Sequence, residues 1–155
     1  MKSLLILGAG GFGHMIKETA QVLGYEEIVF LDDMVKEDDV IGMCCDYVIK
    51  HEDYPVAVAA FGNNKTRLFW TDKLLEEGYE VPAIVHPSAV VSPSVTLEPG
   101  CFIMQRSVVN TNTKIERAAL VNSGAVVDHN SVVCAGAHVG LGSVVKANCT
   151  IESGR

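Results

Sequence analysis

The chain has 155 residues, of which 48% are hydrophobic, and its formal net charge at pH 7 is -7. This apolar content suffices for one ordinary domain or two small ones with buried cores, and it excludes a predominantly disordered chain. The negative charge disfavours nucleic acid and anionic membranes as partners, because no cluster of lysines and arginines offsets it. The apolar run after Lys2 is too short for a signal peptide or a membrane-spanning helix, so we expect a cytoplasmic protein with small-molecule ligands.

Cysteine usage indicates a reduced protein without a disulfide framework. The chain has five cysteines, an odd number, and no Cys-x-x-Cys pair. A disulfide-stapled domain carries an even set and a structural zinc site usually takes paired cysteines, so neither is expected. We interpret all five as small hydrophobic residues: Cys44, Cys45, Cys101, Cys134 and Cys149.

The chain opens with the pattern of a strand, a glycine turn and a helix. Ser3–Leu7 is a continuous apolar run, typical of a buried parallel strand. Glycines follow with the spacing Gly8-x-Gly10-x-x-Gly13, and apolar residues then recur at helical spacing. Further elements are predicted at residues 27–31 (strand), 56–61 (strand), 65–77 (helix) and 81–85 (strand). We therefore expect an α/β, Rossmann-like subdomain with a parallel sheet over residues 1–85.

The glycine turn could hold a dinucleotide or a single nucleotide. A nicotinamide enzyme needs the turn, an acid about 20 residues later and a second sheet half for the nicotinamide. Asp32 stands at that distance, but a repetitive segment begins where the second half should be. A single half still offers unpaired N–H groups and a positive helix end to a diphosphate, so we expect a nucleotide sugar. The residues expected to bind it are Gly8, Gly10, Gly11, Phe12, Gly13, Asp32, Asp33 and Asn63; for the two acids the alternative is a solvated strand end.

From residue 89 the chain repeats with a period of six residues. The third place of eleven successive hexads holds Val, Leu or Ile, and the first place holds a small residue except at Val95. One large and one small inward residue every six positions suit a strand that turns a corner after each hexad. A β-sandwich would instead show a period of two with clusters of turn residues. We therefore predict a left-handed parallel β-helix over residues 86–155, with three hexads in each coil.

Five stretches within residues 4–151 resemble one known family. They are "LGAGGFG", "FLDD", "FGNNKTR", "VHPSAVVSPS" and "GAVVDHNSVV". The chain is similar to the bacterial sugar acetyltransferases, hexapeptide-repeat transferases that include sialic acid O-acetyltransferases and nucleotide-linked 4-aminosugar N-acetyltransferases. The resemblance implies a homotrimer that uses acetyl-CoA, with the active site between neighbouring β-helices.

Histidines are the candidates for the base that acetyl transfer requires, because imidazole titrates near neutral pH. His51 in a polar loop and His86 before Pro87 are expected to be structural. His129 takes the fifth place of its hexad, so its ring should project outward. On periodicity alone it is an exposed coil residue, whereas the resemblance implies that it is the catalytic base.

The neighbours of His129 bear on its strength as a base. The family tends to have an acid directly after this histidine, and Asn130 takes that place here. An Asn carbonyl can accept the ring N–H and fix the tautomer, but it stabilises imidazolium less than a carboxylate does. Two alternatives stay open: a weaker base oriented by Asn130, or Asp128 substituting for the missing acid.

The resemblance also implies which residues lie near acetyl-CoA. His138 matches a family histidine near the acetyl group, and Gly140 is expected to line the same site. Ala147 stands one coil above His129, so its backbone N–H is a candidate donor to the tetrahedral oxyanion. His129 and His138 are half a coil apart, so their rings should point to different sides of one β-helix and converge only across a trimer interface.

Two features depart from the family. Phe12 stands where the family commonly has a histidine, and His14 is expected to be an ordinary residue of the first helical turn. The eleven hexads make three complete coils and two-thirds of a fourth, whereas family members continue further. The resemblance therefore implies either a truncated chain or an incomplete CoA site.

The favoured function is acetyl-CoA-dependent N-acetylation of the 4-amino group of a nucleotide-linked sugar. The alternatives are a sialic acid O-acetyltransferase and a non-catalytic trimer that binds nucleotide sugars. No metal is expected, because the zinc site of γ-class carbonic anhydrases on the same fold needs three histidines. The repeats hold only His129 and His138.

Overall fold

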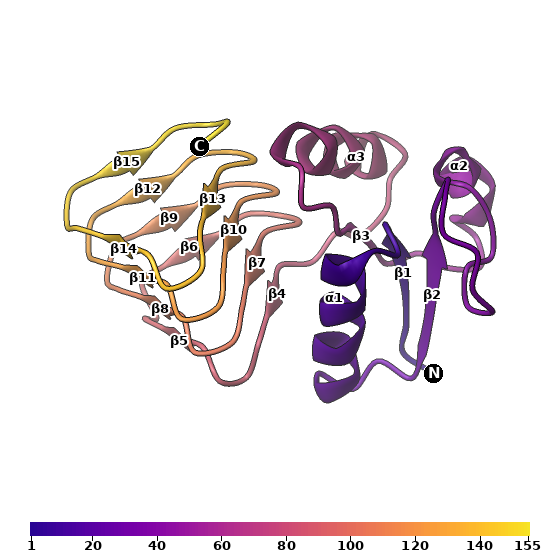
Figure 1. Ribbon diagram of the computed structural model, residues 1–155, viewed down its shortest axis with the longest axis horizontal. Helices are drawn as coiled ribbons and strands as arrows, with labels where there is room; N and C mark the ends of the chain where they lie inside the picture. The colour runs from indigo at the N-terminus through magenta and orange to yellow at the C-terminus, as the bar shows by residue number, and fades with distance from the viewer. The chain divides into compact units, whose positions relative to one another are not determined.

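The computed structural model describes residues 1–155, which divide into two compact units, Met1–Pro82 and Ala83–Arg155. The first unit contains a three-stranded parallel sheet of order β2-β1-β3 (Figure 1). Its elements are β1 (Ser3–Leu7), α1 (Gly11–Val22), β2 (Glu27–Leu31), the 3-10 helix η1 (Cys44–Asp46), α2 (Tyr47–Lys50), β3 (Ala57–Ala59) and α3 (Asn64–Glu76). None of the helices combines the length and hydropathy that a bilayer-spanning segment requires.

The central strand β1 forms the middle of the core of the first unit. Its residues from Leu4 to Leu7 are fully buried, because neighbours pair with it on both sides and helices cover its apolar side chains. Ile16 and Ala20, four residues apart on α1, are also fully buried, as expected for one apolar helix face. The strands predicted at Ser3–Leu7 and Glu27–Leu31 are confirmed with their bounds.

The prediction that residues 81–85 form a strand of this sheet is wrong. Glu80 forms only an isolated bridge with Val56, and Ile84–Val85 is the strand β4, which pairs with β7 (Phe102–Ile103) in the second unit. The reason is visible in the repeat, because residues 83–88 already form a hexad with a small first residue and Val85 in the third place. The repeats therefore begin one hexad earlier than predicted.

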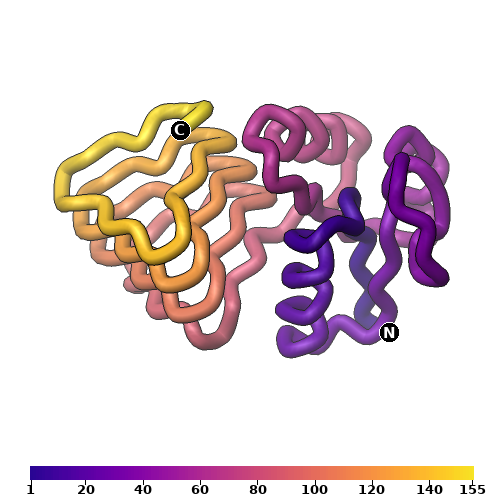
Figure 2. Tube along the Cα trace, in the orientation of Figure 1, coloured from indigo at the N-terminus to yellow at the C-terminus, as the bar shows by residue number.

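The second unit is a left-handed parallel β-helix built from three four-stranded sheets. Figure 2 shows its coils stacked one on another. Its other strands are β5 (Val90–Val91), β6 (Thr96–Leu97), β8 (Val108–Val109), β9 (Lys114–Ile115), β10 (Leu120–Val121), β11 (Val126–Val127), β12 (Val132–Val133), β13 (His138–Val139), β14 (Val144–Val145) and β15 (Thr150–Ile151). The sheet orders are β13-β10-β7-β4, β14-β11-β8-β5 and β15-β12-β9-β6. Four coils are therefore complete, rather than three and two-thirds.

The core of the β-helix consists of the residues that the repeat places inward. Third-place residues such as Val109, Val121 and Val133 are fully buried, as are small first-place residues such as Ala125. The buried polar first-place residues donate to backbone carbonyls; the Ser107 hydroxyl, for example, donates to the Met104 carbonyl over 2.7 Å. The six-residue spacing therefore determines the inside of this unit.

Candidate functional site

The first unit carries a pocket of about 590 Å³ at the carboxyl ends of its strands. We call it the glycine-turn pocket. It is lined by Gly8, Gly10, Gly11, Phe12, Asp32, Asp33, Met34, Val35, Cys44, Ala60, Phe61, Gly62, Thr66 and Trp70. The strands β2 and β3 lie on opposite sides of β1, so the chain changes the side of the sheet to which it adds strands at β1. Ligands of open α/β sheets bind at such a topological switch point.

The glycines of the turn have two different roles. A Cβ on Gly13 would lie 1.9 Å from the Gly8 carbonyl oxygen, and Gly8 has a φ of +99°, so both positions require glycine for packing and backbone geometry. Gly10 and Gly11 have no atom within 4 Å of a Cβ, and their N–H groups have no protein acceptor. Because they lie at the N-terminus of α1, these N–H groups can bind an anion.

Asp32 holds the turn in place. Its Oδ2 accepts from the Ala9 N–H over 2.7 Å, and its Oδ1 accepts from the N–H groups of Met34 and Val35 over 2.8 Å each. Burial alone would raise the pKa of this carboxyl, but the three donated hydrogen bonds outweigh it and the pKa is lowered. Asp33 is exposed, and its Oδ1 accepts from the Cys44 N–H.

Two residues expected at this ligand do not line the pocket. Gly13 is buried against Gly8, and the Asn63 side chain is the N-cap of α3, where Oδ1 accepts from the Thr66 N–H and hydroxyl. Sequence reasoning missed the apolar walls, which include Phe61 and Trp70. The stretch "FGNNKTR" already contains Phe61 and Thr66. Trp70 lies four residues after Thr66 on α3, so the two residues share one face of that helix.

The corner between β11 and β12 contains Asp128, His129 and Asn130, and we call it the histidine corner. The His129 Nδ1 lies 2.8 Å from Asn130 Oδ1, which can only accept, so Nδ1 carries the proton. His129 is exposed and its Nε2 has no hydrogen-bond partner within the chain. The unprotonated Nε2 can therefore accept a proton from a ligand.

Asp128 contacts the backbone of the histidine corner rather than the ring. Its Oδ1 accepts from the Asn110 side chain over 3.0 Å and from the His129 N–H over 2.8 Å. The hydrogen bond from Asn110 is the main reason that the pKa of Asp128 is lowered, followed by the bond from the His129 N–H. Of the two alternatives that the sequence left open, Asn130 is the residue in contact with the ring.

Asn130 also meets a backbone requirement. Its φ is +58°, and the same left-handed conformation occurs at other corners, including Asn112 and Asn148. Asn adopts this conformation more readily than most residues with a side chain. Its N–H donates to the Thr111 carbonyl in the coil below, which ties the histidine corner to its neighbour.

His138 lies on β13, in a different sheet from either strand that flanks His129. Its Nε2 lies 3.0 Å from the Asn122 side-chain nitrogen, and because that nitrogen donates, Nε2 is the acceptor. His138 and Gly140 line a pocket of about 260 Å³ together with Ser143 and Arg155. Two of the residues expected at CoA therefore share one pocket.

Ala147 occupies the histidine corner's column one coil further along, since Asn148 N donates to the His129 carbonyl. The Ala147 N–H has no acceptor in the chain. Ala147 is not among the residues that line the pocket beside His138. Its N–H is thus free for a ligand next to His129.

The other histidines have structural partners. His14 lies in the first turn of α1, where its Nε2 is 3.0 Å from a Glu37 carboxylate oxygen. The His51 ring packs on the Tyr79 ring, and the His86 Nδ1 lies 2.8 Å from the Ser88 hydroxyl. No group of three or more His, Cys, Asp or Glu side chains is placed to hold a metal ion.

A glycine-turn α/β unit followed by a left-handed β-helix with an exposed histidine is the architecture of a hexapeptide-repeat transferase. The family model described as the PglD N-terminal domain matches residues 3–74. The acetyltransferase domain of PglB from Neisseria gonorrhoeae FA1090, solved with acetyl coenzyme A, is 30% identical with a TM-score of 0.89. The match covers 96% of this chain and 84% of that one.

Two further structures are similar. PerB from Caulobacter crescentus, solved with CoA and GDP-perosamine, is 31% identical with a TM-score of 0.85 over 93% of this chain and 71% of that one. WeeI from Acinetobacter baumannii AYE shares the fold, with a TM-score of 0.70 and 17% identity over 97% of this chain and 94% of that one. This chain belongs to the PglD-type family of hexapeptide-repeat sugar acetyltransferases.

Proposed function

We propose that this protein is an acetyl-CoA-dependent N-acetyltransferase for the 4-amino group of a nucleotide-linked sugar, with His129 as the general base. The observation that carries the proposal is the histidine corner, where Asn130 fixes the ring tautomer and leaves Nε2 free. The similarity to PglB with acetyl coenzyme A and to PerB with CoA and GDP-perosamine supports the choice of co-substrate and acceptor class.

In the proposed reaction the neutral sugar amine attacks the thioester carbonyl carbon. His129 Nε2 takes the proton that the nitrogen loses, and the negative charge collects on the carbonyl oxygen of the tetrahedral intermediate. The free N–H of Ala147, next to His129, is the proposed donor to that oxygen. The carbon–sulfur bond then breaks, and the CoA sulfur leaves with the proton from imidazolium, so amide and free thiol are the products.

The nucleotide is proposed to bind in the glycine-turn pocket. The open N–H groups of Gly10 and Gly11 at the end of α1 suit its phosphates. The aromatic side chains of Phe61 and Trp70 offer faces on which a base can stack. Asp33, which is exposed and lines the pocket, is proposed to accept from a hydroxyl or base N–H. The five free cysteines fit a reducing compartment such as the cytoplasm.

A homotrimer is part of the proposal, because His138 lies on a different sheet from the two strands that flank His129. One outward face is apolar along the whole β-helix: the second-place residues of the β14-β11-β8-β5 sheet are Val90, Val108, Val126 and Val144. Val90 and Val144 are 62% and 68% exposed. The corresponding residues of the β15-β12-β9-β6 sheet are mostly polar: Thr96, Lys114, Val132 and Thr150. The valine face is the proposed surface for a second copy of the chain.

The test combines acetyl-CoA with one acceptor at a time: a UDP-linked 4-amino sugar, a GDP-linked 4-amino sugar, free sialic acid or none. Thiol release measures turnover, and mass spectrometry identifies the acetylated product. Release with a nucleotide-linked amino sugar is expected. Release only with sialic acid would favour an O-acetyltransferase, and nucleotide binding without release in any mixture would favour the non-catalytic binding trimer.

A further inference from the structure

We propose that Arg67 positions the loop between β3 and α3 so that the backbone N–H of Gly62, at the wall of the glycine-turn pocket, and that of the adjacent Asn63 bind a phosphate of the nucleotide. This inference rests on the proposed function, since it assigns part of the phosphate contacts in that pocket. Arg67 touches the loop rather than the ligand, so it is a positioning residue.

Arg67 is a buried cation on the first turns of α3. Its relative exposure is 0%. Its Nη1 donates to the Phe61 carbonyl over 3.0 Å and to the Gly62 carbonyl over 3.4 Å, and its Nη2 donates to Asn64 Oδ1 over 2.9 Å. Burial lowers the pKa of the guanidinium to about 10, so it remains charged at neutral pH. A charged side chain is costly to bury, which indicates that its hydrogen bonds serve a purpose that an apolar residue could not.

The bonds from Arg67 determine which way two peptide groups face. In a trans peptide the C=O and the following N–H point in opposite directions, and this chain has no cis peptide bond. Because the Phe61 and Gly62 carbonyls point toward buried Arg67, the N–H groups of Gly62 and Asn63 point away from it. Neither N–H group has a protein acceptor.

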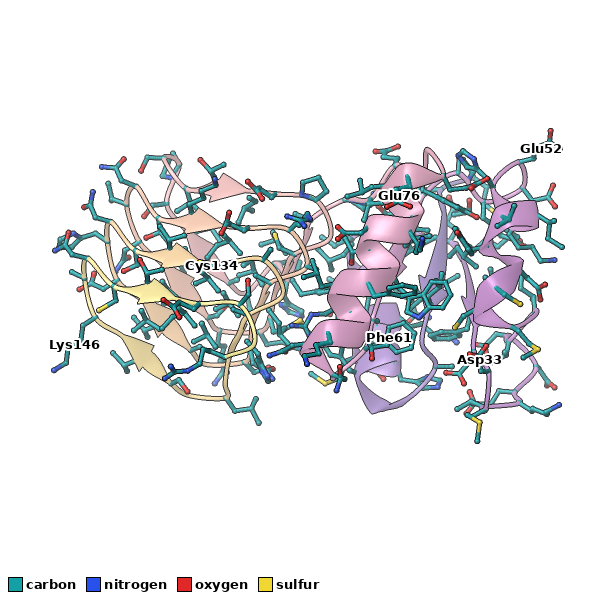
Figure 3. All side chains as sticks on the ribbon, turned by 90° about the horizontal axis from the view of Figure 1, so that it is seen from above. Asp33, Glu52, Phe61, Glu76, Cys134 and Lys146 are labelled. Atoms are coloured by element: carbon teal, nitrogen blue, oxygen red, sulfur yellow. The ribbon has the colours of Figure 1, made fainter.

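The loop borders the glycine-turn pocket, whereas Arg67 does not line it. Gly62 is exposed, lines the glycine-turn pocket and has no atom within 4 Å of a Cβ, so a ligand can approach its backbone closely. Phe61 and Glu76 lie at opposite ends of α3 in Figure 3, which places the loop at the positive, N-terminal end of the helix. The Asn63 side chain is already bound to Thr66, so it does not compete for these N–H groups.

Two helix N-termini therefore contribute to one pocket. Gly10 and Gly11 present free N–H groups at α1, and Gly62, which lines the pocket, presents one at α3 beside the free N–H of Asn63. A nucleotide sugar carries two phosphates, and two separate sets of donors suit them better than one. The sequence analysis named Asn63 as a candidate ligand residue, but not Gly62 or Arg67, because a lone arginine carries no glycine-rich signature of its own.

The first experiment measures binding of UDP and of GDP by calorimetry to the wild type, to Arg67→Lys and to Thr71→Val. Lysine keeps the charge but cannot reach two carbonyls with a planar fork, so we expect the diphosphate that binds the wild type to bind this variant about tenfold more weakly. Thr71 is a buried control on the same helix whose hydroxyl has no partner, and its replacement should leave binding unchanged. Binding of CoA, and the KM for acetyl-CoA, should be the same in all three proteins, while the KM for the nucleotide sugar rises only in Arg67→Lys.

Equal diphosphate affinity in the wild type and Arg67→Lys would overturn the role of Arg67 and leave the proposed function standing. A wild type that binds neither UDP nor GDP would overturn both. A second measurement needs no variant: amide resonances of Gly62 and Asn63 in the wild type should move on addition of the bound diphosphate but not of its nucleoside. Resonances that stay in place with the diphosphate would overturn the inference even if Arg67→Lys failed to fold.

Discussion

The imidazole Nδ1 of His129 lies 2.8 Å from the amide oxygen of Asn130, its neighbour in the chain. A base and the group that orients it usually come from distant parts of a protein. Here one corner of a β-helix holds both the proposed base and the group in contact with it, because Asn130 directly follows His129 in the chain. The amide of Asn130 is neutral, and this bears on the pH dependence expected for the proposed reaction.

Replacement of His129 by alanine should remove the base without disturbing the fold, since the ring is exposed and bonds only to Asn130. We expect kcat to fall by about 10²–10⁴-fold, the usual contribution of a general base. Affinity for UDP or GDP should not change, because the nucleotide is proposed to bind in the other unit. His86→Ala is the matched control, a histidine at another corner, and it should retain turnover. Turnover retained in His129→Ala would remove this residue from the mechanism.

Asn130→Asp should make His129 a stronger base that is protonated at a higher pH. A carboxylate beside Nδ1 stabilises imidazolium more than the neutral amide oxygen does. Because only the neutral ring can accept a proton, the acidic limb of the kcat/KM profile should move to higher pH, and the rate on its alkaline side should rise. Asp also tolerates the positive φ found at this position. A profile that coincides with that of the wild type would show that the Asn130 contact does not tune the base.

The N–H of Ala147 can be deleted by a substitution that the backbone already accepts. Pro93 occupies the same place in its hexad as Ala147, Thr111 and His129, so proline fits this corner of the coil. Ala147→Pro should lower kcat by about 10²–10³-fold through loss of an oxyanion donor, with little change in thermal stability. Thr111→Pro, in the same column, is the control and should retain activity. Equal activity of the two variants would contradict the oxyanion role.

The β-helix could be predicted from the sequence because its packing requirement recurs every six residues. Each coil needs one aliphatic and one small inward side chain per strand. This regular pattern can be recognised in the sequence without knowing which strands pair with one another. The first hexad was missed for the opposite reason. Residues 81–85 are a short apolar run, and a run of that length does not tell which sheet it joins.

The glycine-turn pocket could be predicted only in part. The spacing of Gly8, Gly10 and Gly13 reports a local backbone geometry, so it is visible in the sequence. The roles of Asp32, Asn63 and Arg67 depend on which backbone groups the fold brings to them. In the structure Asp32 accepts from the Ala9 N–H, Asn63 caps α3 and Arg67 is buried. In the sequence each of them resembles an ordinary polar surface residue.

The lowered pKa of Asp32 predicts how the stability of the protein depends on pH. A carboxyl whose pKa is lower in the folded state stabilises it above the ordinary value of 3.8, and that stabilisation is lost as the pH falls through the lowered pKa. Asp32→Asn should therefore reduce the free energy of unfolding at pH 7, by about 1 kcal/mol for the weakened bonds. The gap to the wild type should close below pH 3.8. Denaturant unfolding at several pH values measures it, with exposed Asp38→Asn as the control; a gap independent of pH would contradict the assignment.

The valine face predicts that a lysine substitution within it disrupts the proposed trimer, whereas a lysine on the neighbouring sheet does not. Val126 and Val132 hold the same outward place in neighbouring strands, but Val126 lies between Val108 and Val144, whereas Val132 lies between Lys114 and Thr150. A lysine at residue 126 would bury a charge in an apolar contact between copies, while a lysine at residue 132 would join a polar sheet. Sedimentation velocity should therefore find a trimer for the wild type and for Val132→Lys, and smaller species for Val126→Lys. Because His138 lies on a different sheet from the two strands that flank His129, Val126→Lys should also lose acetyl transfer while it retains UDP or GDP binding. A monomeric wild type with full activity would refute the trimeric site, and a trimeric Val126→Lys would place the interface on another face.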